Sequence, residues 1–148
     1  MGDLPEEKSL KFGNRAKAPI SYYGGKQRLA SRIIELIPQC HNYCEPFAGG
    51  AAVFWRLPQS PRRIDIVNDH DTRLIKFYNV LQDNKLFRKL KHKLEYTLYS
   101  ESMYSLAKKI LKSGNGNAVT QAWAYFVNIN MAYAAAWHLG PMWIILLT

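Results

Sequence analysis

Residues 43–55, with the sequence YCEPFAGGAAVFW, decide how this chain folds. They predict a short strand that ends at Glu45, a turn through the pair Gly49 and Gly50, and an apolar helix that follows. Backbone NH groups at the start of a helix lack partners within that helix, and glycines leave a ligand room to approach them. The stretch therefore predicts a loop that binds a polar ligand, with a plain structural turn as the alternative.

The glycine loop matches neither of the two familiar phosphate-binding motifs. A dinucleotide site requires G-x-G-x-x-G and a P-loop requires Lys followed by Ser or Thr, and neither pattern occurs in this chain. Instead, the carboxylate of Glu45 repels a pyrophosphate and favours a ligand with a cationic or hydroxyl-bearing end. A dinucleotide-dependent oxidoreductase is therefore the least favoured interpretation.

Two further stretches flank the loop and sharpen the prediction. Residues 21–26 have the sequence SYYGGK, and residues 64–71 have the sequence IDIVNDHD. The carboxylates of the second stretch follow the glycines by about 20 residues, the offset at which a neighbouring strand brings an acid to ribose hydroxyls. The three stretches together predict one pocket for a nucleoside-like ligand.

In this order the three stretches resemble the amino-terminal half of the Dam-type DNA adenine-N6 methyltransferases, which use S-adenosylmethionine. Tyr-x-Gly-Gly-Lys at 22–26 resembles the first cofactor motif of that family, and Glu-Pro-Phe-x-Gly-Gly at 45–50 resembles its glycine loop. Asn-Asp-x-Asp at 68–71, before a Leu-Ile-x-x-Tyr-Asn helix, resembles its ribose-binding acid. The resemblance extends over residues 20–133 and implies a transferase that methylates adenine in DNA.

The resemblance also implies a role for each cofactor residue. Tyr22 is the expected aromatic contact, Lys26 its polar companion, and Asp69 the ribose acceptor. Asp71 is the alternative acceptor, but it is better placed as a helix cap. We expect Asp69→Ala to abolish stabilisation by the cofactor and to leave the melting temperature of the free protein nearly unchanged. Ala51 stands where many relatives carry another glycine. The residues expected to shape the loop against the methionine end are Glu45, Phe47 and Gly49.

The catalytic motif of the family is missing from these residues. Adenine N6 is a poor nucleophile, and an enzyme that methylates it must hold the extruded base against the methyl donor. The resembling family uses an Asp-Pro-Pro-Tyr motif for this purpose, and the 148 residues contain no Pro-Pro pair. No catalytic residue is therefore assigned. We expect a truncated or split cofactor-binding half that is inactive alone, and a second chain as the source of the motif.

The order of elements predicts an α/β fold. The expected elements are a helix from Gln27 that stops at Pro38, the strand ending at Glu45, a short helix cut off at Pro58, a strand from Ile64 to Val67, and a helix capped by Asp71. The stripe expected to be buried in the last of these helices is Leu74, Ile75, Tyr78 and Leu81. This order is typical of part of a doubly wound, Rossmann-like methyltransferase sheet, and a helical, basic segment follows it.

The positive charge of the chain predicts a polyanionic partner. The formal net charge is +9 and the isoelectric point is about 9.6, which favours DNA. After residue 84, leucines 86, 90, 94 and 98 share one helical face and basic residues occupy the others. The residues expected to contact DNA are Lys85, Arg88, Lys89, Lys91 and Lys93, together with Lys108, Lys109 and Lys112. A solvated helix face and a non-catalytic DNA-binding module are the alternatives.

Two more helices are expected beyond this segment. One runs from Met103 to Lys112, with Ser100 or Ser102 as its cap, and the other begins at Ala118. Its predicted core residues are Trp123, Phe126, Val127 and Met131, while Tyr125, Asn128 and Asn130 either meet bases or join the core.

Domain limits and location follow from the remaining residues. The expected division is a flexible basic arm (1–18), an S-adenosylmethionine-binding α/β part (19–84), a helical DNA-facing segment that begins a target-recognition region (85–134), and an apolar truncated end (135–148). Gly140 and Pro141 interrupt that end, so no membrane span is expected. Cys40, His41 and Cys44 fall short of a zinc set, so no metal is expected. The absence of a secretory signal favours the cytoplasm.

Overall fold

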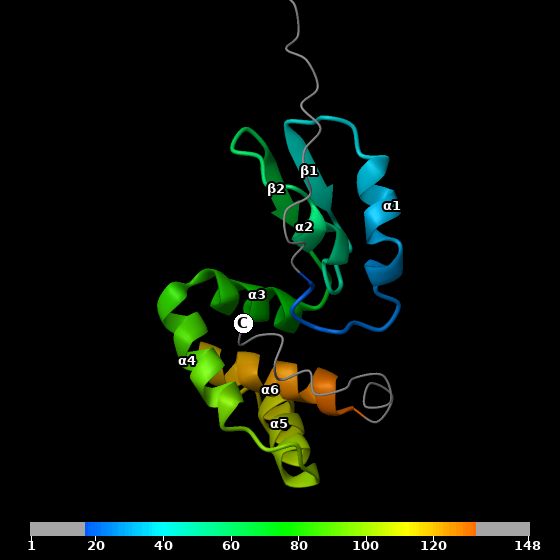
Figure 1. Ribbon diagram of the computed structural model, residues 1–148. Coiled ribbons are helices and arrows are strands. Elements are labelled where there is room, and N and C mark those ends of the chain that lie inside the picture. The colour runs from blue at the N-terminus through cyan, green and yellow to red at the C-terminus, as the bar shows by residue number, and fades with distance from the viewer. Residues whose placement is uncertain (1–16, 133–148) are drawn as a thin grey trace, which may run out of the picture.

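The computed structural model describes residues 17–132 (Figure 1). The elements in chain order are η1 (Lys26–Arg28), α1 (Ala30–Glu35), β1 (Asn42–Glu45), α2 (Ala52–Arg56), β2 (Ile64–Val67), α3 (Thr72–Gln82), α4 (Asn84–Glu95), α5 (Glu101–Ser113) and α6 (Ala118–Met131). The predicted α/β class is confirmed. The described residues form a sheet of two strands, so the wider Rossmann-like sheet stays a prediction.

The two strands are parallel, with α2 in the connection between them. Tyr43 lies opposite Asp65 and Cys44 lies opposite Ile66. Side chains alternate between the two faces of a strand. One face, with Tyr43, packs against α1 and α2, whereas Cys44, Ile64 and Ile66 are exposed on the other. Cys44 is exposed because no described helix covers this face of the strand.

The helix expected from residue 27 is divided. The segment begins as the short 3-10 helix η1, and Leu29 separates it from α1. The isoleucines of α1 and Tyr43 of β1 both pack against a small cluster formed by Ala30, Ala52 and Val53. The helix therefore packs on α2, and it ends at Glu35, before the predicted stop at Pro38.

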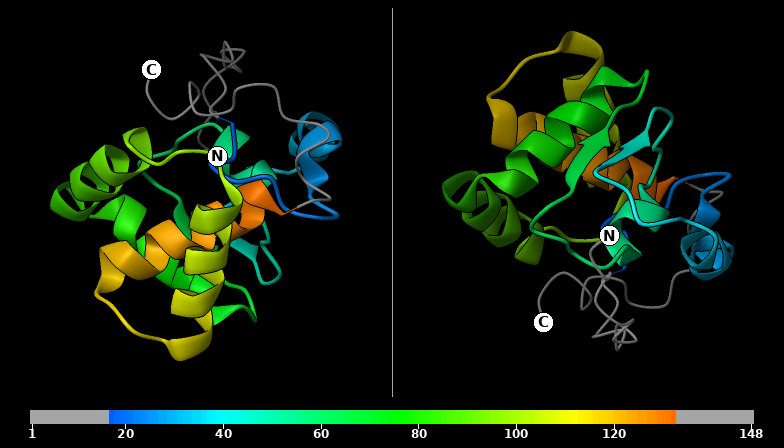
Figure 2. Two further views of the ribbon diagram at one scale, coloured as in Figure 1. Left: turned by 90° about the horizontal axis from the view of Figure 1, so that it is seen from below. Right: turned by 90° about the horizontal axis from the view of Figure 1, so that it is seen from above.

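The longest described helix, α6, is the centre of the main core. It crosses the helical layer and packs against α3, α4 and α5 (Figure 2). The predicted core residues Trp123, Phe126 and Val127 are all buried. Tyr125 and Asn130, which had base contact as an alternative, are buried as well, with 3% and 6% of their surface exposed.

The core stripe of α3 differs from the prediction. Leu74 and Tyr78 are buried as expected, but Phe77 is fully buried and was missed. Its ring lies 5.9 Å from the ring of Tyr125 and 6.2 Å from that of Phe126. The buried stripe faces α6 because aromatic groups there offer the larger apolar contact.

Leu98 does not continue the leucine face of α4. The helix ends at Glu95, and Thr97 Oγ1 donates to the carbonyl of Lys93 at 2.7 Å. The same hydroxyl accepts from the indole nitrogen of Trp123 at 2.8 Å. These two bonds stabilise the chain where α4 ends. Leu98 lies beyond the helix and is 77% exposed.

Side-chain caps fix where the four long helices begin. The capping residues are Asp71, Asp83, Ser100 and Asn117, each of which accepts from a backbone NH of the first turn. Ser100, and not Ser102, therefore caps α5, and Gly114 ends it at a φ of +69°. No helix within residues 17–132 is both long enough and apolar enough to cross a bilayer.

The main core joins residues from both sides of position 84. It contains Ile20 and Ala51 near the glycine loop as well as Leu90 and Val127 of the helical layer. The division at 84 stays a prediction, and the core shows that the two parts are packed together. Most of the arm at 1–18 and the whole apolar end at 135–148 lie outside the described residues.

Candidate functional site

The loop between β1 and α2 has a left-handed backbone at two positions. Gly49 has a φ of +53° and Ala51 a φ of +49°. The turn closes where the NH of Ala51 donates to the carbonyl of Ala48 at 2.8 Å, and the NH of Ala48 donates to the carbonyl of Asn68 at 3.0 Å. The loop is therefore fastened to the end of β2 as well as to β1.

Tyr22 lies directly on the two glycines. A Cβ atom at Gly49 would approach Tyr22 Cδ1 to 3.1 Å, and one at Gly50 would approach Tyr22 Cβ to 3.2 Å. Tyr22 itself sits in a turn in which the NH of Gly25 donates to its carbonyl at 2.9 Å. The glycines thus allow the close approach of an aromatic residue from a segment far away in the sequence.

Asp69 fastens the same loop from the other side. Its Oδ2 accepts from the NH of Gly49 at 2.8 Å, and its Oδ1 accepts from the NH of Asp71 at 3.0 Å. Burial, followed by the negative charges of Asp69 and Asp71, raises the pKa of the Tyr22 hydroxyl above its ordinary value. The structure therefore brings Tyr22, Gly49 and Asp69 together; their contact with a cofactor stays a prediction.

Glu45 is buried at the point where β1 ends. Its Oε1 accepts from the NH of Phe54 at 2.7 Å and from the hydroxyl of Tyr43 at 2.6 Å. The carboxylate of Glu45 thus accepts from a backbone NH in the first turn of α2, where the sequence predicts NH groups that are free to bind a ligand. Burial and then the bond to Glu45 raise the pKa of Tyr43. Glu45 thus joins the strand to α2, and its contact with a ligand stays a prediction.

Two of the expected cofactor residues are not drawn into this cluster. Lys26 is exposed at the start of η1, and its side chain makes no hydrogen bond or ion pair with the described residues. Phe47 is 78% exposed. Both side chains remain available to a ligand, and neither is held in place in advance.

Tyr78 is a site residue that the sequence analysis placed only in the core. Its hydroxyl donates to the carbonyl of Gly49 at 3.0 Å, and burial raises its pKa. A buried tyrosine hydroxyl needs a hydrogen-bond partner, and this requirement is the signal in the sequence that could have indicated a second role for Tyr78. Asp69 therefore binds the backbone NH of Gly49, and Tyr78 binds its carbonyl.

Asp71 connects the glycine loop to the helical layer. It caps α3, forms a two-point ion pair with Arg73 at 2.9 and 3.0 Å, and lies 3.4 Å from the hydroxyl of Tyr125. Its predicted role as a cap is confirmed. Burial opposes the charge, but the bonds from Arg73 prevail and hold the pKa of Asp71 below its ordinary value. Its contribution to stability is therefore complete above about pH 4 and is lost as the pH falls through the lowered pKa.

The basic residues of α4 differ in their availability to DNA. Lys85, Arg88 and Lys89 are exposed, whereas Lys91 is half-buried. Lys93 is also half-buried, and its ammonium lies 4.7 Å from the ring centre of Trp123. A cation over an aromatic face is held there, so Lys93 packs on α6. Contact with DNA stays a prediction for all five residues.

No group of three or more His, Cys, Asp or Glu side chains within residues 17–132 is arranged to hold a metal ion. Cys40 is half-buried and Cys44 is exposed, and both are free thiols.

The left-handed alanine in the loop gives a test of the backbone geometry. We expect Ala51→Gly to be nearly neutral, because relief of about 1–2 kcal/mol of left-handed strain offsets the loss of a buried methyl worth about 0.8 kcal/mol. Ala52→Gly, in the adjacent right-handed helix, loses a similar methyl without any relief and costs about 1–2 kcal/mol. Urea unfolding measures the difference; equal losses would contradict the left-handed assignment.

Comparison with known proteins identifies the family. A family model for D12 class N6 adenine-specific DNA methyltransferases matches residues 22–131. The Type II methyltransferase M1.LlaDCHI of Lactococcus lactis subsp. cremoris is 39% identical over 62 residues, which cover 41% of this chain and 21% of that relative. The matched range begins at Tyr22 and includes Gly49, Asp69 and α3 to α6, so the expected family is confirmed. The chain belongs to the D12 class of N6 adenine-specific DNA methyltransferases.

Proposed function

We propose that this chain is the S-adenosylmethionine-binding part of a site-specific DNA adenine-N6 methyltransferase. The observation that carries the proposal is the junction of Tyr22, Gly49 and Asp69, which come from three separate segments and meet in one place. Membership of the D12 class supplies the chemistry: the family name specifies adenine N6 in DNA. The relative from Lactococcus lactis is named a Type II methyltransferase, which supports a role in restriction and modification.

Each residue of the cluster suits the adenosyl group. A carboxylate offers about four acceptor positions, and backbone NH groups take two of them on Asp69, so about two remain for a ribose diol. The ring of Tyr22 presents an apolar face beside the loop. Phe47, which is exposed, adds a second aromatic face without rearrangement of the core. Lys26 and Glu45 are the proposed polar contacts at the two ends of the cofactor.

Methyl transfer requires a group that these residues do not contain. The acceptor nitrogen of adenine must be held against the methyl donor, and the resembling family does so with Asp-Pro-Pro-Tyr. Since no Pro-Pro pair occurs in the 148 residues, we propose that they bind the cofactor and that the base-holding motif comes from another polypeptide segment or a second chain.

The proposal predicts binding without turnover. Calorimetry with S-adenosylmethionine is expected to give saturable binding with one site. Incubation with methyl-labelled cofactor and double-stranded DNA is expected to give no N6-methyladenine. Addition of a polypeptide that carries Asp-Pro-Pro-Tyr from a D12 relative is the positive control for the assay. Methylated adenine from the chain alone, or no cofactor binding, would overturn this proposal.

A DNA-binding module without a cofactor is the second candidate. The observation that favours it is the exposure of Lys85, Arg88 and Lys89 on α4. Salt-sensitive DNA binding together with a complete lack of response to S-adenosylmethionine would select this candidate.

A further inference from the structure

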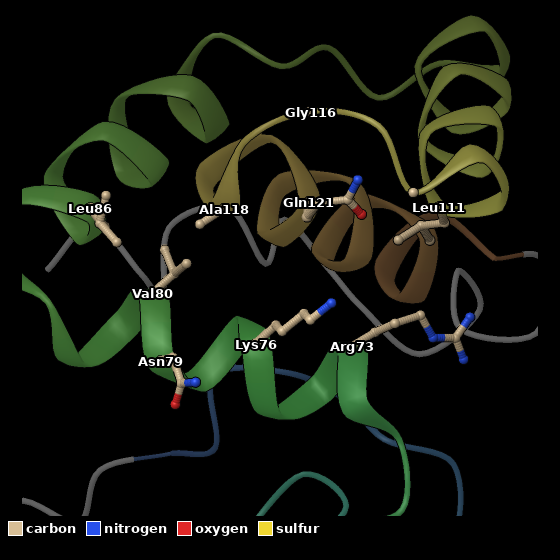
Figure 3. Close-up of a pocket in the computed structure, with 10 residues that line it drawn as sticks. Arg73, Lys76, Asn79, Val80, Leu86, Leu111, Gly116, Ala118 and Gln121 are labelled. Atoms are coloured by element: carbon tan, nitrogen blue, oxygen red, sulfur yellow. The ribbon is translucent and has the colours of Figure 1, made fainter.

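A groove runs between α3, α5 and α6, apart from the residues that hold the glycine loop. It consists of two adjoining hollows of about 520 and 360 Å³, which share Arg73 and Leu111. The larger hollow lies between α3, the loop after α5 and the start of α6, and Figure 3 shows Lys76 extending from α3 toward α6. We call the two hollows together the α3–α5 groove.

The charged residues that line the groove are all cations. Arg73 and Lys76 belong to α3, and Lys108, Lys109 and Lys112 belong to α5. No Asp or Glu is among the described residues that line either hollow. Asp71 neutralises part of the charge of Arg73, but the four lysines have no carboxylate within ion-pair distance among the described residues. The groove therefore carries a concentrated positive potential.

Groups other than lysine also suit an anionic ligand. Asn128 of α6, half-buried at the smaller hollow, offers an amide donor, whereas the amide nitrogen of Gln121 at the larger hollow already donates to the carbonyl of Asn115. Lys108 lies 5.3 Å from the ring centre of Tyr104 but, unlike the half-buried Lys93, is exposed to solvent. The apolar side chains Val80, Leu86 and Leu111 complete the lining.

From this geometry we propose that the α3–α5 groove binds backbone phosphates of the substrate DNA. The proposal rests on the proposed function, because it takes DNA as the substrate. Lysines on two facing helices match a row of phosphates, since each ammonium neutralises one phosphate and such pairing is independent of base sequence. The proposal places the main phosphate contacts in the groove and not on α4, where Lys93 is held on Trp123 and the remaining cations line neither hollow.

A pair of matched variants tests the assignment. The groove variant carries Lys108→Gln, Lys109→Gln and Lys112→Gln, and the control variant carries Lys85→Gln, Arg88→Gln and Lys89→Gln on α4. Each removes three positive charges from exposed positions of one helix. Arg73 is kept in both, because its ion pair with Asp71 supports the start of α3.

The measurement is the affinity for double-stranded DNA as a function of salt. The slope of log K against log salt changes by about 0.9 for each phosphate that the protein no longer neutralises, so the slope of the groove variant is expected to be shallower by about 2 to 3. The slope of the control variant is expected to change by less than about 1. Lys76→Gln, on the opposite wall, is expected to reduce the slope by about 1.

The outcomes separate this proposal from the others. An α4 variant whose slope falls as much as that of the groove variant, or an unchanged slope for the groove variant, would overturn it. Displacement of DNA by micromolar inorganic pyrophosphate would assign the groove to a small phosphate ligand and would also overturn it. Calorimetry with S-adenosylmethionine is expected to be unchanged in both variants, so failure here leaves the cofactor proposal intact. Circular dichroism confirms that each variant is folded.

Discussion

Replacement of Gly49 by Ala is expected to abolish S-adenosylmethionine binding and to lower the free energy of unfolding by about 2–4 kcal/mol. The residue has a φ of +53°, at which a side chain costs about 1–2 kcal/mol. In addition, the new methyl would lie 3.1 Å from Tyr22 Cδ1, so the tyrosine ring has to move. Because that ring is the proposed aromatic contact, cofactor binding fails together with the packing. Urea unfolding and calorimetry measure the two effects.

Gly114 supplies a matched control for this prediction. Its φ is +69°, and a Cβ atom there would meet nothing within 4 Å. Gly114→Ala therefore carries the left-handed strain alone, about 1–2 kcal/mol, and is expected to leave cofactor binding unchanged. If the two variants were equally destabilised and both still bound S-adenosylmethionine, the contact between Tyr22 and Gly49 would have no role in cofactor binding.

Asp69→Asn is expected to weaken cofactor binding by at least about tenfold and to destabilise the free protein by about 1–3 kcal/mol. An amide has one acceptor oxygen, so it retains one of the two backbone bonds and places a donor against the other NH. The expected loss of stability differs from the expectation drawn from the sequence for Asp69→Ala, in which the melting temperature of the free protein stays nearly unchanged. The two backbone bonds give Asp69 a structural role in addition to the proposed ribose contact.

Asp65→Asn on the preceding strand is the control. Asp65 accepts from Arg63 at 2.5 Å near the surface and has no bond to the loop. Its replacement is expected to leave the affinity for S-adenosylmethionine unchanged. Higher salt is not expected to restore the affinity of the Asp69 variant for the cofactor, because the partners of this side chain are neutral NH groups. An equal loss of affinity in both variants would indicate a general loss of fold and would remove Asp69 from the proposed site.

Local sequence signals were enough to predict the strands and helices around the glycine loop. The run before Glu45 and the stretch from Ile64 to Val67 predicted both strands, because each is bounded by turn residues. Asp71 predicted a helix start, and its side chain caps α3. These features depend on residues within a few positions of one another, which is why a sequence without a structure reveals them.

Local sequence signals could not predict the contacts between segments that are distant in the sequence. Phe77 faces α6 because Tyr125 and Phe126 lie there, and periodicity along α3 alone does not select that face. Arg73 becomes part of a basic groove only when α5 approaches α3. The motif predicted that Asp69 belongs near the glycines, but not that its carboxylate is already bonded to the NH of Gly49. The pairing of partners is a property of the tertiary structure.

The most direct measurement is a titration of isotope-labelled protein with S-adenosylmethionine, followed through backbone amide signals in NMR spectra. The account predicts the largest shifts at Gly49, Gly50 and Asp69, with further changes at Tyr22, while amides of α4 stay in place. Saturable shifts confined to other parts of residues 17–132, with these four signals unchanged, would contradict it.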